Sequence, residues 1–246
     1  MPKLYKRDAS ACELIACKDC GIYQLCRLAS GCEDPSVSNA LVRRRFILRR
    51  GEFLYRNGDT FQDIYAVRHG SIKTYIASDD GKTQITNFLG SGELIGFDAI
   101  DAGRFDSEAI VLETTSVCEV SFSHFQGLSR KIPGLLDQLI VVMSHAILRD
   151  QQMMLLLGKK SATEKLATYL VNLGRHIDKN KSSPSTYKLT MSRRDIGNYL
   201  GLTQETICRI LARFQEDGII RIQRKYLHFV DMNRLRELAS KIQAER

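Results

Sequence analysis

The stretch Ser192-Arg-Arg-Asp195-Ile-Gly-Asn-Tyr-Leu-Gly201-Leu-Thr203-Gln-Glu-Thr-Ile-Cys-Arg-Ile-Leu-Ala-Arg-Phe214 decides the fold of the C-terminal part of the chain. Ser192 can cap a helix over residues 193–200, with Asp195 as its capping-box partner, and Gly201 ends that helix. Thr203 can cap a second helix that continues to about residue 217. Two helices joined by a short turn that contains glycine predict a helix-turn-helix.

The second predicted helix has an apolar face and a polar face. Its inward stripe consists of Ile207, Ile210, Leu211 and Phe214. Its outward first turns carry Gln204, Glu205, Cys208 and Arg209. In a helix-turn-helix these outward positions enter the major groove, where Arg can bind guanine O6 and N7 and Glu can accept a hydrogen bond from cytosine N4. We therefore predict that these four residues and the cap residues Ser192 and Thr203 bind double-stranded DNA.

Positive charge is concentrated in the same part of the chain. The net charge is +8 at pH 7. Residues 161–246 hold 16 Lys and Arg against 9 Asp and Glu, whereas residues 1–160 hold 20 against 19. A basic part on a near-neutral body is typical of nucleic-acid binding, because neutralisation of phosphates supplies most of the non-specific affinity. A solvated basic surface is the alternative on charge alone.

The segments around the helix-turn-helix predict a winged helix. Residues 219–222 and 226–230 read as the two strands of a β-hairpin wing, and a terminal helix begins at Leu235. Residues 161–177 have the apolar period of an amphipathic helix. Residues 178–185 are polar and include Ser-Ser-Pro-Ser, which predicts a loop.

Residues 41–125 consist of short β-prone runs separated by turns, which predicts an antiparallel sandwich or barrel. The runs include residues 64–67, 71–76 and 83–88, and the turns contain Gly51, Gly58, Gly70, Gly81 and Gly92. No Ser/His/Asp set and no phosphate-binding glycine loop lies in this region, and the five histidines are scattered along the chain. We therefore predict a scaffold rather than an enzyme.

A long helix is predicted from Pro133-Gly134 to about residue 157. Apolar residues at alternating steps of four and three mark a coiled-coil seam, here called the seam: Leu136, Ile140, Met143, Ile147, Met154 and Leu157. Asp150 occupies the remaining seam position. We predict a homodimer through this helix, in which two Asp150 carboxylates repel each other and weaken association. The alternative is that Asp150 lies at the solvated edge of the seam.

Five of the seven cysteines lie within the first 32 residues. The sequence has no signal peptide and no apolar run long enough to span a membrane, so we expect a cytoplasmic protein with reduced thiols and no membrane partner. Clustered thiols then favour metal or redox chemistry over disulfides. Cys17, Cys20 and Cys26 offer one set of ligands, whereas Cys12-x4-Cys17-x2-Cys20 matches plant-type ferredoxin spacing. Spacing alone does not choose between them, and a structural zinc lacks a second Cys-x-x-Cys.

Five stretches, together with the order of barrel, seam helix and winged helix, carry a family resemblance. They are Cys17-x2-Cys20-x5-Cys26; Gly92-Glu-Leu-Ile-Gly-Phe-Asp-Ala-Ile100; Glu113-Thr-Thr-Ser-Val-Cys118-Glu119; Met154-Leu-Leu-Leu157 with Lys159-Lys160; and Asp195-Ile-Gly-Asn-Tyr-Leu-Gly-Leu-Thr203 with Glu205, Thr206 and Arg209. Over nearly all of residues 17–230 the chain resembles the CRP/FNR family of bacterial transcription regulators, and within it the FNR oxygen-sensing regulators.

The resemblance implies a 4Fe-4S cluster on Cys17, Cys20, Cys26 and Cys118, which keeps a homodimer competent to bind DNA until oxygen degrades it. It also implies a palindromic promoter site, TTGAT and its inverted partner, in which Glu205 and Arg209 read a G·C pair. Cys208 stands where FNR proteins have Ser, so the resemblance does not imply which base lies beside it. Residues 90–98 resemble a surface through which FNR proteins contact RNA polymerase.

One departure concerns cyclic nucleotides. In relatives that bind them, the barrel carries a Glu and an Arg-Ser pair that hold ribose and phosphate, and here those stretches read Ile95-Gly96-Phe97-Asp98 and Asp106-Ser107-Glu108-Ala109. A phosphate would meet carboxylates without its arginine, so we expect no cyclic-nucleotide ligand. A CRP-like regulator gated by a small molecule, by thiol oxidation or by zinc is the alternative to an iron-sulfur regulator.

The expected fold class is α+β, with four parts. They are a cysteine-rich cluster-binding segment over residues 1–32, a β-barrel resembling the cyclic-nucleotide-binding jelly roll over 33–130, a dimerisation helix over 131–158, and a winged helix-turn-helix domain over 159–246. The expected function is oxygen-responsive transcription regulation, as activator or repressor.

Overall fold

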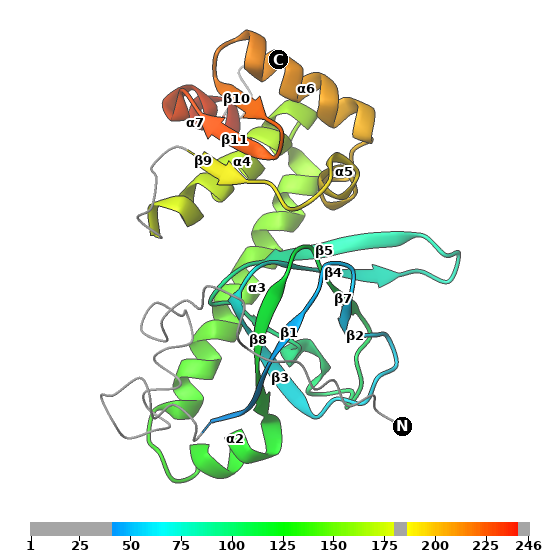
Figure 1. The fold of residues 1–246 in the computed structure, drawn as a ribbon, viewed down its shortest axis with the longest axis vertical. Helices are drawn as coiled ribbons and strands as arrows, with labels where there is room; N and C mark the ends of the chain where they lie inside the picture. The colour runs from blue at the N-terminus through cyan, green and yellow to red at the C-terminus, as the bar shows by residue number, and fades with distance from the viewer. Residues whose placement is uncertain (1–40, 180–185, 241–246) are drawn as a thin grey trace. The chain divides into compact units, whose positions relative to one another are not determined.

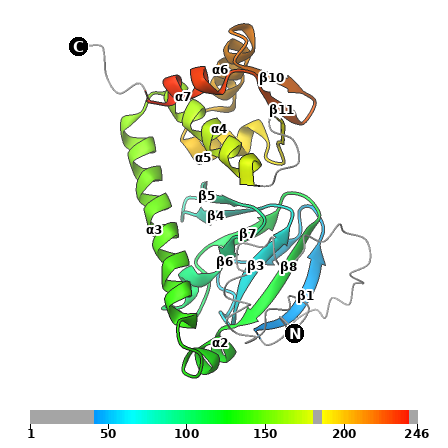
Figure 2. The ribbon, with the colours of Figure 1, turned by 90° about the vertical axis from the view of Figure 1, so that its left-hand side faces the viewer.

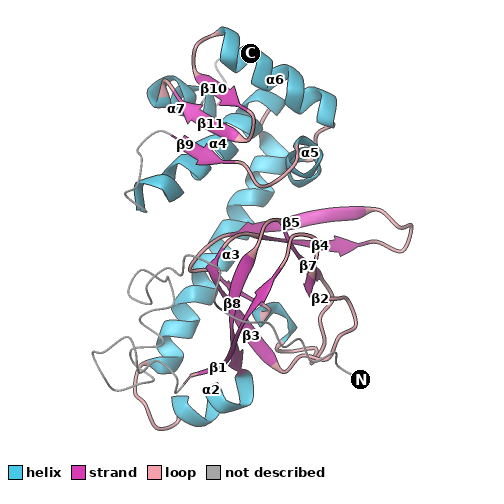
Figure 3. Ribbon diagram, viewed as in Figure 1, coloured by secondary structure: helices cyan, strands magenta, loops and turns pink. Residues whose placement is uncertain are grey.

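The computed structural model describes residues 41–179 and 186–240 (Figure 1). The chain divides into two compact units between Ile147 and Leu148. The described part of the first unit is built mainly of strands, and that of the second mainly of helices (Figure 3). The predicted cluster-binding segment, including Cys17, Cys20 and Cys26, lies outside the described residues.

Two antiparallel four-stranded sheets form most of the described part of the first unit. One sheet has the order β1 (Val42–Leu48), β8 (Thr115–Ser121), β3 (Asp63–His69) and β6 (Leu94–Ile95); the other has the order β2 (Phe53–Tyr55), β7 (Glu108–Val111), β4 (Ile72–Ala77) and β5 (Thr83–Leu89). Side chains from both sheets share one buried cluster, which includes Val67, Ile72, Ala109 and Val117. The sheets therefore pack face to face as a jelly-roll sandwich.

The predicted α+β fold with a jelly roll is confirmed, although the two described sheets of the predicted β-barrel are not closed into a barrel. Among the described residues, no strand ladder joins the two sheets, and an isolated bridge between Thr60 and Arg104 lies outside the strands. The predicted strand runs are confirmed as β3, β4 and β5. Five glycines of the predicted turns, Gly51, Gly58, Gly70, Gly81 and Gly92, have positive φ angles, which L-residues with side chains rarely adopt, whereas Gly90 of the predicted Gly90-Ser91-Gly92 turn does not.

The β-rich region ends earlier than predicted, because a helix begins before Phe125. Ser121 is the N-cap of α2 (Phe122–Ser129), and its hydroxyl accepts a hydrogen bond from the backbone N–H of His124. A short 3-10 helix, η3 (Phe97–Ala99), follows β6. Figure 2 shows α2 in the connection between β8 and the long helix.

The long helix α3 (Leu135–Lys159) confirms the prediction of a helix after Pro133-Gly134. In the first unit its side chains Leu135 and Leu139 are buried in a cluster with Ile64 and Val120 of the strands. One side of the helix is therefore fixed to its own sandwich. The boundary between the two units falls within α3.

The second unit is a winged helix-turn-helix. Its further elements are α4 (Ala162–Lys179), β9 (Thr186–Lys188), α5 (Arg193–Leu200), α6 (Gln204–Glu216), β10 (Ile220–Gln223), β11 (Tyr226–Phe229) and α7 (Met232–Ser240). The predicted hairpin is confirmed as β10 and β11, but the sequence analysis missed β9, which pairs antiparallel with β11. Buried apolar side chains of α4, α5 and α6, such as Leu166, Ile196 and Ile207, form the core.

Candidate functional site

The first helix of the helix-turn-helix begins at the predicted capping box. The Ser192 hydroxyl accepts a hydrogen bond from the Asp195 backbone N–H at 3.0 Å, and the Asp195 carboxylate accepts one from the Ser192 backbone N–H at 3.0 Å. Gly201 ends the helix with a φ of 62°. The Ser192 side chain thus has a structural partner, and its predicted contact with DNA remains a prediction.

The turn between α5 and α6 depends on close approach at Gly197. Its carbonyl accepts a hydrogen bond from the Leu202 backbone N–H at 2.8 Å. A Cβ atom placed on Gly197 would lie 2.7 Å from the carbonyl oxygen of Leu202. Glycine at this position therefore allows the two helices of the motif to meet across a short turn.

The second helix, α6, presents the predicted faces. Thr203 is its N-cap and accepts a hydrogen bond from the Thr206 backbone N–H at 3.1 Å. The inward residues Ile207, Ile210, Leu211 and Phe214 are buried. The outward residues Gln204, Glu205, Cys208 and Arg209 are exposed. The sequence therefore predicted both faces of this helix. The outward face is exposed, as is required of a helix that enters the major groove of DNA.

Arg193, the first residue of α5, is a candidate that the sequence analysis did not single out. Its side chain is half-buried. Burial lowers the pKa of its guanidinium, and interactions with Cys208 and Tyr169 oppose this effect. Arg193 therefore adds a cation beside the exposed first turns of α6. Its position at the start of a helix-turn-helix was the signal that could have identified it.

The last turn of α3 is attached to the second unit by packing and hydrogen bonds. Leu156 is buried, and a Leu157 methyl carbon would lie 3.7 Å from a Cβ on Gly201. Lys160 Nζ donates hydrogen bonds to Thr168 Oγ1 of α4 and to the carbonyl oxygen of Ala239 in α7, each at 2.8 Å. Within the second unit, the end of the seam helix and the helix-turn-helix are therefore one packed body.

The predicted seam residues form a largely exposed stripe on α3. Leu136, Ile140, Ile147 and Met154 are exposed, and Met154 reaches 73%. Met143 is partly buried against the cluster that contains Leu135 and Leu139, and Asp150 is exposed. An exposed apolar stripe of this length is the kind of surface that a partner covers. The part of these residues in dimerisation remains a prediction.

Cys118, the predicted remote ligand, lies on the central strand β8 and is 6% exposed. It belongs to the apolar cluster that also contains Leu41, Ala66, Leu135 and Leu139. A thiolate is the usual ligand of iron-sulfur clusters, and this thiol shares its apolar cluster with Leu41, the first described residue after the N-terminal cysteines. Cys118 therefore fits the predicted ligand set. Three further thiolates would have to come from residues outside the described ranges. The described ranges contain no group of three His, Cys, Asp or Glu side chains that could hold a metal ion.

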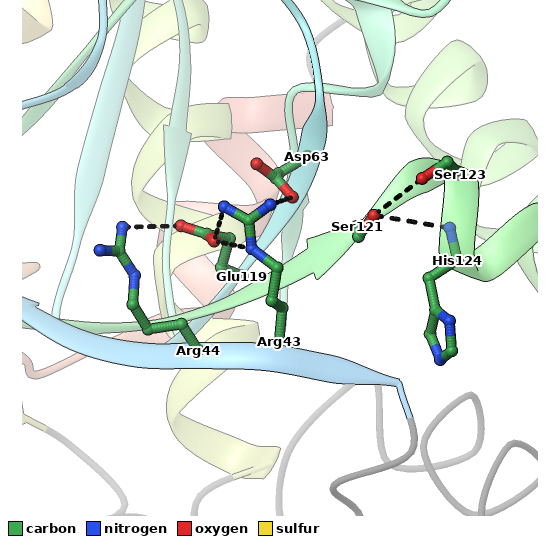
Figure 4. Close-up of polar contacts among 7 residues, drawn as sticks. All are labelled: Arg43, Arg44, Asp63, Glu119, Ser121, Ser123 and His124. Carbon is green, nitrogen blue, oxygen red and sulfur yellow. Dashed lines mark hydrogen bonds and ion pairs between the residues drawn. The ribbon is translucent and has the colours of Figure 1, made fainter. Parts of the chain in front are cut away.

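An ion-pair network joins two buried carboxylates, Asp63 and Glu119, to the half-exposed side chains of Arg43 and Arg44 (Figure 4). Glu119 is 2% exposed. Its Oε1 accepts a hydrogen bond from Arg43 Nε at 2.7 Å, and its Oε2 accepts one from Arg44 Nη2 at 2.8 Å. Arg43 Nη1 also lies 3.5 Å from Asp63 Oδ1. Burial and the neighbouring Glu119 raise the pKa of Asp63, and the two arginines oppose that effect.

The stretches that correspond to a nucleotide site are lined by aromatic and acidic groups. The rings of Tyr55 and Phe105 stack at a centroid distance of 3.9 Å in the buried cluster between the sheets. Asp98 Oδ2 accepts a hydrogen bond from Ser107 Oγ at 3.2 Å. Burial, and then the charge of Asp98, raise the pKa of Tyr55 above its usual value. These contacts fit the expectation that no cyclic nucleotide binds, which remains a prediction.

None of the helices in the described ranges is long and apolar enough to cross a membrane.

Two family models match the chain. The Crp-like helix-turn-helix domain matches residues 164–238, and the cyclic nucleotide-binding domain matches residues 45–131. Together with the capped helices and the exposed face of α6, these matches define a DNA-binding transcription regulator with a jelly-roll domain.

Relatives define the family more closely. The chain is 45% identical over 224 residues to the transcriptional activator protein Anr of Pseudomonas protegens, covering 91% of this chain and 92% of that protein. It is 41% identical over 238 residues to the fumarate and nitrate reduction regulatory protein of Escherichia coli, covering 96% and 95%. The chain belongs to the CRP/FNR family of transcription regulators, so the predictions of family and of a non-enzymatic role are confirmed.

A solved structure is similar over most of the chain. FixK2 from Bradyrhizobium japonicum has a TM-score of 0.74 and 29% sequence identity, covering 82% of this chain and 100% of that one. Membership of the family indicates DNA binding and dimer formation.

Proposed function

We propose that this chain is an oxygen-responsive transcription regulator that binds DNA as a 4Fe-4S-loaded homodimer without oxygen and loses DNA binding when oxygen removes the cluster. The position of Cys118 is the observation that carries this proposal. Its thiol is buried on the central strand β8, in the apolar cluster that also contains Leu41, the first described residue. The similarity to Anr and to the fumarate and nitrate reduction regulatory protein supports the same function.

The proposed ligands are Cys17, Cys20, Cys26 and Cys118. When bound, a cluster supplies an oxygen-labile link between the thiolates of the N-terminal segment and the sandwich. Cys118 anchors that link, because β8 pairs with β1 on one side and β3 on the other. A ligand on a central strand moves little, so Cys118 is the fixed member of the proposed ligand set.

Packing around Cys118 offers a route to the DNA-binding unit. Leu135 and Leu139, in the first turns of α3, share the apolar cluster of Cys118. A change at this cluster can therefore alter how α3 presents its seam. Dimerisation through the seam would then outweigh the repulsion between two Asp150 carboxylates and would space two α6 helices one turn of DNA apart.

At the promoter, we propose that α6 reads a palindrome of the TTGAT type. Glu205 and Arg209 are exposed on its first turns and would contact a G·C pair. The loop over residues 90–98 is the proposed contact with RNA polymerase, and the relatives named as activators support an activating role at some promoters.

The visible spectrum, iron and acid-labile sulfide of anaerobically prepared protein test this function. The native chain should be coloured, and Cys118→Ser should abolish cluster uptake, because a hydroxyl is a poor iron ligand. Cys208→Ser is the matched control, since Cys208 is exposed on α6 and should leave uptake unchanged. Colourless native protein without iron would overturn the proposal, and bound zinc would support the thiol or zinc alternative.

A nucleotide-gated regulator is the second candidate, because the cyclic nucleotide-binding domain model matches residues 45–131. Titration of cyclic AMP or cyclic GMP into aerobic protein separates the two functions. Gain of specific DNA binding would favour gating by nucleotide. We expect no gain, because the carboxylates of Asp98 and Glu108 would repel the phosphate of the nucleotide.

A further inference from the structure

A β-bulge at the start of β1 directs two arginines to one carboxylate. Val42 pairs with Val120 and Arg44 pairs with Glu119, so Arg43 is an extra residue on β1. In a regular strand, successive side chains point to opposite faces, and only one of two neighbouring arginines could reach Glu119. The bulge removes this restriction, and both guanidinium groups bind the carboxylate.

This arrangement holds β1 and β8 together beside the proposed ligand Cys118. Arg45, the next residue of β1, is opposite Cys118. Leu41, which precedes the bulge, packs in the cluster of Cys118. Glu119 follows Cys118 on the strand, so its side chain points to the other face of the sheet. The ion pairs therefore fix the backbone around Cys118 without touching the apolar surroundings of the thiol.

Stability alone is a weak reason for such a network. Glu119 and Asp63 are both buried, and removing two carboxylates from water opposes much of the attraction that they gain from the arginines. Apolar side chains would hold two strands together as well, and they resist a one-residue slip of register, but their contacts are not directional. Two charge-assisted hydrogen bonds to one carboxylate require one alignment of β1 on β8.

We propose that Arg43, Arg44, Asp63 and Glu119 form an ion-pair clamp that positions Cys118 and the start of β1 for binding of the N-terminal cysteines to a shared metal centre. These four are positioning residues, and their role rests on the proposed function. The clamp fixes the start of β1 relative to the thiol of Cys118. The four clamp residues supply no ligand to the cluster, but they affect how long a bound cluster survives.

The test compares Glu119→Gln with Glu108→Gln in the full-length chain. Glu108 is a matched control on the other sheet, where its carboxylate accepts a hydrogen bond from Tyr75 Oη at 2.7 Å. Cluster-free protein is treated with N-ethylmaleimide well below its unfolding temperature, and peptide mass spectrometry follows Cys118. Exposed Cys208 in the same sample gives the reference rate.

Glu119→Gln should raise the modification rate of Cys118 roughly tenfold, since it weakens hydrogen bonds to a charged group and favours local opening. Glu108→Gln should leave that rate unchanged, and Glu119→Asp should restore most of the native protection. Equal rates in Glu119→Gln and Glu108→Gln would overturn the clamp. If Glu119→Gln does not fold, Arg44→Met replaces it, because the Arg44 side chain is half-exposed and leaves the Arg43 contact in place.

A second measurement connects the clamp to the metal centre. After anaerobic reconstitution, Glu119→Gln should lose its visible absorbance in air several-fold faster than the native chain and Glu108→Gln. Loss at the native rate would overturn the positioning role. If the native chain itself takes up no iron, the proposed function fails, and the modification rates still decide whether the network positions Cys118.

Discussion

The two units differ in how their functional residues are distributed along the chain. In the DNA-binding unit, the caps, the turn and the outward face of α6 all lie between Ser192 and Phe214. In the sandwich, the residues around Cys118 come from distant positions, and Arg43 lies 76 residues from Glu119. Local chemistry thus builds one site, and strand register builds the other.

The largest expected effect tests whether the turn between α5 and α6 requires glycine at position 197. Gly197→Ala should destabilise the DNA-binding unit towards the upper end of the ~1–3 kcal/mol typical of overpacking, because the new Cβ would lie 2.7 Å from the Leu202 carbonyl oxygen. Gly127→Ala in α2 of the sandwich unit has nothing within 4 Å and should be neutral or stabilising. Thermal unfolding of both variants checks this. Equal unfolding temperatures for the two variants would show that the turn at Gly197 tolerates a side chain as well as the open position at Gly127 does.

A smaller effect should appear on DNA binding without a loss of folding. Arg209→Ala should weaken binding to a TTGAT palindrome by about 1–3 kcal/mol, the usual contribution of a bidentate contact to guanine. Arg213→Ala is the control on the same helix, where Arg213 Nε lies 3.9 Å from Asp217. Fluorescence anisotropy with the palindrome and with a scrambled duplex measures both. The same loss on both duplexes would show that Arg209 contacts phosphate rather than a base.

The smallest effect concerns α3, which contributes to both units. Asp150→Ala should strengthen the dimer in air by up to about fivefold, because exposed like charges repel only weakly in water. Asp137→Ala changes an exposed carboxylate of the same helix outside the seam and should not strengthen the dimer. Sedimentation equilibrium gives the two dissociation constants. An unchanged constant for Asp150→Ala would support the solvated-edge alternative.

Prediction from sequence succeeded where the determining interactions are local. The start of α5 and of α6 follows from the N-caps Ser192 and Thr203, and the end of α5 follows from the left-handed glycine Gly201. The long helix α3 follows from its apolar period.

Prediction failed where a contact depends on distant residues or on a few bonds. β9 has three residues and exists through its pairing with β11. The open sandwich could not be separated from a closed barrel, since both have the same alternation within strands. The bulge at Arg43 left no mark in the sequence, so Glu119 appeared to be an ordinary strand residue next to a cysteine.

Lys160 has a practical consequence for anyone who cuts the chain in two. Ala239 lies near the end of α7, where carbonyl groups lack partners within the helix, and the ammonium of Lys160 supplies one from the other end of the unit. Leu156 is buried nearby in the sequence. A stand-alone DNA-binding fragment should therefore begin upstream of Leu156, since a fragment that starts after residue 160 would lose the hydrogen bond from Lys160 to the Ala239 carbonyl oxygen.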